Sequence, residues 1–241
     1  MISATVMPAP APRQVDAALA TIAHELRGPL ATIVLALELH SGSGDPAARR
    51  ALAMAARQAR GAVRIVDDLF DLYAGSWDRL PLRKEVVELA EVVTAATEAT
   101  AHLLAARGHR LTVSLPAEPL FLVADPVRLE QVLTNLLSNA AKFTDPGGQI
   151  RLTARGEVGQ AVLCVKDNGR GIAPDQLPHV FDLFRQVPCP AARRTGGLGV
   201  GLALVKSLVE LHGGSVAAFS DGPGTGCEFV VRLPADTSGS C

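Results

Sequence analysis

The sequence is poor in aromatic residues, which make up only 4% of its 241 residues. Its hydrophobic core must therefore consist mainly of alanine, leucine and valine. Long apolar runs are also missing: the longest candidate, Leu30–Leu39, is interrupted by Glu38. A helix that crosses a bilayer needs roughly 18–20 apolar residues. We therefore expect no membrane contact within this chain.

The chain also lacks a strong net charge, a metal-like cysteine spacing and a basic amino-terminal start. The net charge is −1, which argues against nucleic acid as a partner. The four cysteines show no paired spacing and are typical of reduced thiols in a cytoplasmic protein: Cys164, Cys189, Cys227 and Cys241. Residues 1–14 are rich in alanine and proline. We interpret them as a flexible lead-in rather than a secretory signal.

The amino-terminal part of the chain has the apolar pattern of a helix. Apolar residues recur every three or four positions over about 15–40, which predicts one narrow buried stripe: Val15, Leu19, Ile22, Leu26, Leu30, Ile33 and Leu37. At about 100° per residue, His24 faces roughly 160° away from that stripe, toward solvent. Glu25 lies beside it, and Pro29 predicts a bend in the helix next to both. An isolated exposed histidine is usually inert. A functional role for His24 therefore depends on motifs elsewhere in the chain.

A second helix is predicted from Pro46 to about Tyr73, after the turn at 41–45. Its stripe also contains many small residues: Leu52, Ala55, Ala59, Val63, Val66, Phe70 and Tyr73. The two helices should form an antiparallel hairpin. Because one hairpin cannot cover both stripes, we expect a second copy to complete a four-helix bundle in a homodimer.

The remainder predicts an α/β sandwich, one mixed sheet with helices on one side. We divide the chain into a lead-in (1–14), a helical domain (15–75), a linker (76–84), an α/β domain (85–234) and a tail (235–241). Helices are expected at about 88–107, at 126–143 after an Asp125 cap, and at 200–212. Strands are expected at 79–85, 110–115, 120–123, 149–155, 161–166, 215–219 and 227–233.

Three polar motifs lie in the second domain. Asn135 and Asn139 share one face of the 126–143 helix with Lys142, which suits hydrated magnesium and phosphates, although helical asparagines are often merely solvated. The run 167–171, Asp-Asn-Gly-Arg-Gly, follows a strand; its aspartate could accept a bond from an exocyclic amine, but the run is also an ordinary turn.

The third motif is the glycine-rich run Gly196-Gly197-Leu-Gly199-Val-Gly201-Leu at the start of the last helix. It can cradle a phosphate with backbone N–H groups. No strand leads directly into it, so a Rossmann unit is excluded. The preceding loop, 185–195, has the composition of a mobile lid.

In this order, the motifs resemble those of the sensor histidine kinase family over about residues 15–234. His24 and its flanks are similar to the phosphoacceptor box of the HisKA dimerisation domain. The second domain resembles the GHKL-type ATPase domain, with the N box at 135–143, the G1 box at 167–171, the F box at 181–184, the G2 box at 197–201 and a last glycine box at 224–226.

The resemblance implies the Bergerat ATP-binding fold. It implies that Asp167 binds the adenine amino group, that Gly169, Gly171 and Ile172 border the base, and that Phe143 packs on it. It implies that Asn139 holds Mg²⁺ with help from Asn135 and that Lys142 contacts the phosphates. The residues implied to close over the triphosphate are Gly197, Leu198, Gly199, Gly201 and Leu202. His24 is the implied nucleophile, and Glu25 accepts its proton or fixes its tautomer.

The residue type at position 135 distinguishes ATP hydrolysis from phosphate transfer to a protein nucleophile. Gyrase-type ATPases carry a glutamate at this position, which activates water, whereas asparagine is a poor base. A supplied nucleophile should therefore attack ATP, in agreement with His24 as the acceptor.

Two residues depart from the family pattern. Gly28 stands four residues after His24, where a polar residue is common, and we predict weak phosphatase activity toward the partner receiver domain. Cys227 stands where serine or threonine is usual. A thiol is the weaker hydrogen-bonding group, so nucleotide affinity is expected to be lower.

The resemblance implies an ATP-dependent protein-histidine kinase that passes its phosphate to an aspartate of a response regulator. We expect a cytoplasmic core of a larger sensor, with a hybrid kinase as one candidate parent. One alternative is a dimeric scaffold that binds ATP without phosphotransfer. Another is a phosphotransferase with a vestigial ATP site.

Overall fold

The computed structural model describes residues 82–185 and 199–235, together with seven helical residues nearer the amino terminus. Those seven are Leu30, Ala31, Ile33, Leu52, Ala55, Ala59 and Ala62. They lie in the segments predicted as a helical hairpin, and each is in an α-helix. The remainder of that hairpin, including the predicted bend at Pro29, lies outside the described residues. None of the helices described is both long and apolar enough to span a membrane.

Eleven elements make up the described α/β domain. In chain order they are β1 (Glu85–Glu88), α3 (Leu89–Ala106), β2 (Arg110–Ser114), β3 (Phe121–Ala124), α4 (Pro126–Phe143), β4 (Gln149–Glu157), β5 (Gln160–Asp167), η1 (Leu177–His179), α5 (Gly201–Leu211), β6 (Ser215–Phe219) and β7 (Glu228–Pro234). The three predicted helices are confirmed to within one residue at each end.

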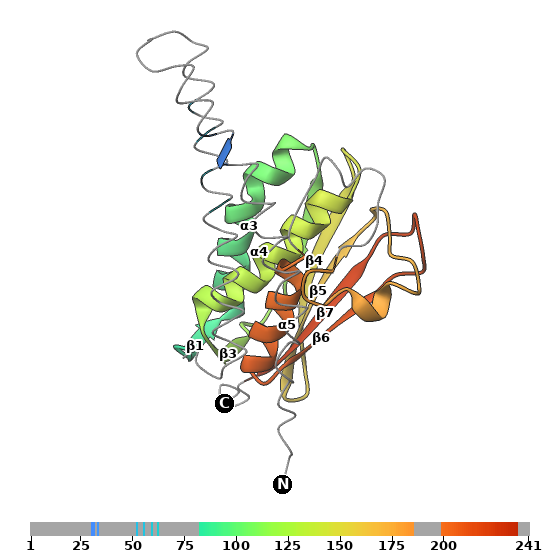
Figure 1. Cartoon of the computed structure of the whole chain (residues 1–241). Coiled ribbons are helices and arrows are strands. Elements are labelled where there is room, and N and C mark those ends of the chain that lie inside the picture. The colour runs from blue at the N-terminus through green and yellow to red at the C-terminus, as the bar shows by residue number, and fades with distance from the viewer. Residues whose placement is uncertain are drawn as a thin grey trace, which may run out of the picture.

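Five strands form one mixed sheet in the order β2-β4-β5-β7-β6. Strand β2 runs parallel to β4, and the other neighbours are antiparallel. Figure 1 shows α3, α4 and α5 together on one face of this sheet. The predicted sandwich with helices on one side is therefore confirmed.

Two further strands depart from the prediction. Strand β1 covers Glu85–Glu88 and pairs antiparallel with β3 in a separate two-stranded sheet. Of the strand predicted at 79–85, residues 82–84 are not in a strand, and 79–81 lie outside the described residues. Val86 lies opposite Val123, and Val87 lies opposite Leu122. The prediction of a single sheet was wrong, because the position of β1 depends on its partner β3 rather than on its own residue pattern.

Helix α4 is the element that positions most of the predicted polar site. Asp125 caps its amino terminus: the side chain accepts the N–H of Arg128 at 3.2 Å and that of Arg83 at 2.9 Å. Pro126 occupies the first turn, where its missing N–H costs nothing. The buried stripe of α4 packs against the sheet and the neighbouring helices: Leu129, Val132, Leu133, Leu136, Leu137, Ala140 and Ala141. The opposite side of the helix is left for polar residues.

Candidate functional site

The polar face of α4 lies next to the amino terminus of α5. Asn135 and Asn139 are both half-buried. Gly201 begins α5, and a Cβ atom at that position would lie 3.6 Å from Asn135 Oδ1. The structure thus brings the N-box helix beside the helix that follows the glycine-rich run. Leu202 packs against the core and holds this end of α5 in place.

Asn135 carries a buried polar atom without a partner. Its Nδ2 is inaccessible to solvent and makes no hydrogen bond within the described part of the chain. A buried donor left unpaired is costly, and a bound water or ion is one of the explanations for such groups in native proteins. The amide therefore fits a site where an anionic group binds between α4 and α5.

Lys142 and Phe143 end α4 on the same side. The Lys142 ammonium lies 4.8 Å from the centre of the Phe143 ring. That ring is 37% exposed, so part of it is open to a ligand. An exposed aromatic face next to a cation suits the planar base and the phosphates of a nucleotide.

Asp167 is the buried acid of the site. It ends β5 and is only 6% exposed. Its Oδ1 accepts the N–H of Gly169 at 2.8 Å and that of Cys227 at 3.3 Å. Burial raises the pKa of Asp167, and these two backbone bonds together with the Thr144 hydroxyl partly offset the increase. A desolvated carboxylate held at a strand end is a strong acceptor for an exocyclic amine.

The glycines of the G1 box bring backbone segments of the protein together. A Cβ on Gly169 would clash with the carbonyl oxygen of Phe143, and one on Gly171 would clash with that of Gly222. Gly171 also has a φ of +66°. The sequence interpretation placed these glycines against a ligand, and the structure gives them this second reason. Ile172 is buried and donates its N–H to Ser220 Oγ at 2.9 Å.

Cys227 holds Asp167 through its backbone. The N–H of Asp167 donates to the Cys227 carbonyl at 2.9 Å, in addition to the Cys227 N–H bond described above. Burial and the Asp167 charge raise the pKa of the Cys227 thiol to about 12, so the thiol is neutral. The two backbone bonds do not depend on which side chain occupies this position.

Gly199, where the described chain resumes after residue 185, is bonded to the F box. Phe184, the last F-box residue, has a φ of +61° and donates its N–H to the carbonyl of Gly199 at 3.1 Å. Gly199 itself has a φ of +69°. Four predicted site residues lie outside the described residues: His24, Glu25, Gly197 and Leu198.

Sequence reasoning missed three contributors. Thr144 is 1% exposed and lies beside the Asp167 carboxyl group. Ser220 follows β6 and joins the G1 box to the last glycine box by accepting from Ile172 and donating to Gly226. Arg107 binds the end of α4. The position of Thr144 directly after Phe143 is the one signal that could have identified it, whereas the other two act across long sequence separations.

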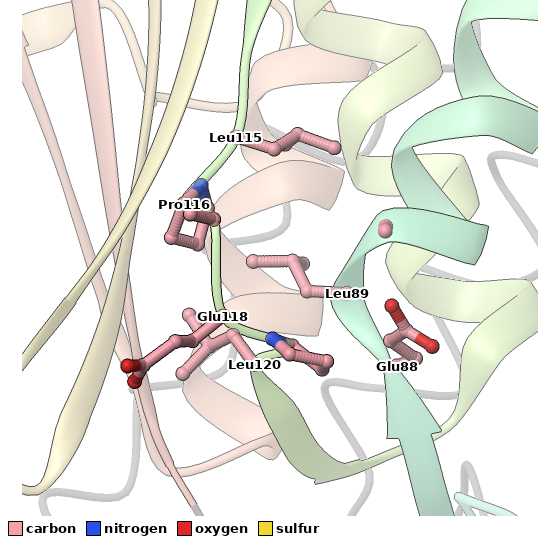
Figure 2. Close-up of a pocket in the computed structure, with 9 residues that line it drawn as sticks. Glu88, Leu89, Leu115, Pro116, Glu118 and Leu120 are labelled. Atoms are coloured by element: carbon pink, nitrogen blue, oxygen red, sulfur yellow. The ribbon is translucent and has the colours of Figure 1, made fainter.

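Two cavities lie elsewhere in the described domain, and neither is lined by a residue of this site. The cavity in Figure 2, of about 110 Å³, lies between α3 and the segment that joins β2 to β3. Leu89, Leu115 and Leu120 line it, and its two carboxylates, Glu88 and Glu118, have no cation among the lining residues. Nor do the described residues contain three or more His, Cys, Asp or Glu grouped as a metal site. A cation here would depend on asparagine oxygens and substrate phosphates, as Mg²⁺ often does with nucleotides.

Two family models match separate parts of the chain. Residues 124–237 match the model described as histidine kinase-, DNA gyrase B-, and HSP90-like ATPase. Residues 14–74 match the His Kinase A phospho-acceptor domain. The second match includes His24, and the first includes every predicted nucleotide-binding residue.

Individual relatives agree with these matches. Hybrid signal transduction histidine kinase D of Dictyostelium discoideum is 35% identical over 89% of this chain, which covers 14% of the relative. The probable sensor histidine kinase TcrY of Mycobacterium tuberculosis is 36% identical over 90% of this chain and 45% of its own length. The chain thus spans less than half of these curated relatives. The structure of full-length ShkA in complex with AMPPNP is 28% identical, with a TM-score of 0.68 over 95% of this chain and 47% of that one.

Proposed function

Because this chain belongs to the sensor histidine kinase family, we propose that it transfers the γ-phosphoryl group of ATP to His24. From His24 the phosphate passes to an aspartate of a response regulator receiver domain. The observation that carries this proposal is the pairing of two matches in one chain: a phospho-acceptor domain that includes His24 and an ATPase-type domain with a buried Asp167.

In this proposal the nucleotide lies between α4, the G1 turn and the start of α5. Asp167 accepts a hydrogen bond from the adenine amino group. Gly169, Gly171 and Ile172 border the base, and Phe143 packs on it. The buried carboxylate and the exposed Phe143 ring support this orientation. The related ShkA structure contains AMPPNP, which supports ATP as the ligand of this domain.

The phosphates then face Lys142, the asparagines of α4 and the glycine-rich run. Gly197, Leu198, Gly199, Gly201 and Leu202 are the proposed contacts of the triphosphate. The unpaired Nδ2 of Asn135 supports an anion at this point. Asn139, assisted by Asn135, is the proposed holder of Mg²⁺, which when bound neutralises charge on the transferring phosphoryl group.

The proposed reaction is a direct displacement. A ring nitrogen of His24 attacks the γ-phosphorus, a phosphorus–nitrogen bond forms, and the bond to the bridging oxygen breaks to release ADP. Glu25 accepts the imidazole proton or fixes the reactive tautomer. Asn135 disfavours the competing reaction, because an amide cannot activate a water molecule as a carboxylate does.

A homodimer is part of the proposal. His Kinase A domains dimerise, and here Leu30 and Leu52 lie on the predicted apolar stripes yet are 52% and 47% exposed. Ala55 and Ala62 are buried by contrast. A second copy that completes a four-helix bundle would cover the two leucines. We also propose the division into domains 15–75 and 85–234, joined by the linker 76–84, and a cytoplasmic location for both.

The alternative is a dimeric scaffold that binds ATP without phosphotransfer. Incubation with γ-labelled ATP and Mg²⁺ discriminates between the two. We expect label that is stable in alkali and lost in acid, absent from His24→Gln and retained in His102→Gln, whose histidine is exposed on α3. Nucleotide binding without any protein-bound label would favour the scaffold.

Gly28, which replaces the polar residue common in the family, leads to a proposal on the balance between phosphorylation and dephosphorylation of the receiver domain. A polar side chain at this position is thought to orient water for receiver dephosphorylation, and glycine cannot do so. We expect this chain to phosphorylate its cognate receiver far faster than it dephosphorylates it. Rapid loss of receiver phosphate that depends on residues 15–75 would contradict this.

A further inference from the structure

The carboxyl-terminal end of α4 is held by a side chain outside all of the family motifs. The last four carbonyls of an α-helix have no partner within the helix. In α4, Ala140 O is satisfied locally by the N–H of Thr144 at 3.0 Å. The next two carbonyls, those of Ala141 and Lys142, both accept from Arg107.

Arg107 bridges these two carbonyls with a single nitrogen. Its Nη1 lies 2.8 Å from Ala141 O and 2.8 Å from Lys142 O. His109 adds a third contact, with Nε2 2.9 Å from Ala141 O. The guanidinium is always charged, and a cation at a helix carboxyl terminus also interacts favourably with the helix dipole.

The backbone around Arg107 is attached to the same region. Its carbonyl accepts the N–H of Gly147, and the N–H of Arg110 donates to Gly148 O, both at 3.0 Å. Gly147 and Gly148 lie in the loop that follows α4. The turn at 107–110 therefore holds both the end of the helix and the loop after it.

The anchored end carries the residues that would meet the nucleotide. Lys142 and Phe143 form the last two positions of α4, and the Lys142 ammonium lies over the Phe143 ring. A helix end whose carbonyls lack partners frays. The Phe143 carbonyl is held separately by the N–H of Arg170 at 3.1 Å, whereas Lys142 O depends on Arg107. Loss of the Arg107 donors would loosen the last turn of α4 between these points, and that turn carries the Lys142 and Phe143 side chains.

We propose that Arg107 is a positioning residue for nucleotide binding, which acts by fixing the end of α4 through Ala141 and Lys142. This inference rests on the proposed function, because it assumes that the nucleotide lies against Phe143 and Asp167. Arg107 itself does not touch the nucleotide in this scheme. Its effect is on affinity, through the preorganisation of residues that do.

The test compares arginine variants of the full chain by titration calorimetry with Mg²⁺ and AMPPNP. Arg107→Met keeps the apolar stem and removes the donors. We expect the Kd to increase about tenfold, as loss of one charge-assisted anchoring interaction predicts. Arg107→Lys, which retains a charged donor, should recover affinity to within about threefold of the native chain.

Arg155→Met is the matched control. Arg155 also bonds through its guanidinium, to Glu157 at 2.9 Å, but it lies on β4, its side chain is exposed, and its ion-pair partner is on the same strand. We expect it to leave the Kd unchanged. Binding stoichiometry separates positioning from misfolding, since a partly unfolded variant binds fewer nucleotides per chain while a positioning defect leaves the number unchanged.

Three outcomes would overturn the inference. One is an unchanged Kd in Arg107→Met, and another is a fall in stoichiometry that accounts for the whole loss of binding. Should that variant not fold, Arg107→Gln, whose shorter amide cannot bridge both carbonyls, carries the test: an unchanged Kd overturns the inference, and an increase of about threefold or more supports it. Failure of the native chain to bind AMPPNP would instead refute the proposed function.

Discussion

The carbonyl oxygen of Phe143 accepts the backbone N–H of Arg170 at 3.1 Å. This bond joins the last residue of the N-box helix to the middle of the G1 turn, two motifs that are 27 positions apart in the chain (170 less 143). It also brings Gly169 against the same carbonyl, so that the proposed ring contact and the proposed adenine acceptor share one rigid junction.

Replacement of Gly169 should break this junction. A Cβ in Gly169→Ala would clash with Phe143 O and would also approach Asp167 Oδ1 within 2.8 Å. We expect a loss of about 1–3 kcal/mol in the free energy of unfolding, together with weaker nucleotide binding. Urea unfolding and AMPPNP titration provide the two readouts.

Gly156→Ala is the control for that variant. Gly156 lies in β4, and the nearest atom to its added Cβ is 3.6 Å away, an ordinary contact. We expect little change in stability and none in affinity. Equal effects of the two alanine variants would contradict the close packing argued for Gly169.

The family motifs could be predicted from the sequence because their signals are local. Asp125-Pro126 marks the start of α4 by itself, and the spacing of Asn135 and Asn139 places both on one helix face. The position of Asp167 at the end of an apolar strand could also be predicted, and the structure has it as the last residue of β5. Each of these needs only a few neighbouring residues to be interpreted.

Other features depend on contacts between distant segments. Strand β1 is located by pairing with β3, where Val86 meets Val123. Arg107 reaches carbonyls 34 and 35 positions away. Carbonyls carry no residue signature, so no pattern in the sequence indicates which side chain will bind them. The backbone bonds between Cys227 and Asp167 escaped prediction for the same reason.

The ionised Asp167 side chain should lower the free energy of unfolding of the nucleotide-free protein, although it supports nucleotide binding. Burial raises its pKa above the ordinary 3.8, so its ionised form, present at neutral pH, is disfavoured by folding. The stabilising contribution of the protonated form is complete below pH 3.8 and is lost as the pH rises through the folded pKa. Asp167→Asn removes this cost, because a neutral amide oxygen can still accept from Gly169 and Cys227.

We therefore expect Asp167→Asn to unfold at the same temperature as the native chain or a higher one, in the absence of nucleotide. Its affinity for AMPPNP should fall about hundredfold, since the amide is a weaker acceptor for the adenine amino group. Differential scanning calorimetry and titration measure the two effects. A lower unfolding temperature of Asp167→Asn would refute the expected effect on stability, and a native affinity for AMPPNP would refute the expected effect on binding.

His212 should make the stability of the α/β domain depend on pH. It is 5% exposed, its Nε2 accepts the N–H of Asp125 at 3.0 Å, and its Nδ1 lies 2.8 Å from Leu208 O. Burial lowers the pKa of His212 below 6.5, and nearby Lys84 adds to this, while the Leu208 carbonyl and Asp125 act in the opposite direction. The folded domain thus holds the ring neutral.

The sign of the dependence follows from linkage. In the unfolded chain His212 binds its proton near pH 6.5, whereas in the folded domain it does so only at lower pH. Its contribution to stability is complete above pH 6.5 and is lost as the pH falls through the folded pKa. Urea unfolding at about pH 7.5 and about pH 5.5 should show a loss that is smaller in His212→Gln. An identical loss in both chains would count against this assignment.

The most direct test of the account is the fate of the γ-phosphate in a single turnover of labelled ATP with Mg²⁺. Label should appear on the peptide that contains His24, with ADP formed in equal amount and little free phosphate. His24→Gln should form neither the phosphoprotein nor phosphate above background, because Asn135 cannot activate water in its place. Release of inorganic phosphate by His24→Gln at the rate at which the native chain forms ADP would contradict the account, because water would then be the acceptor.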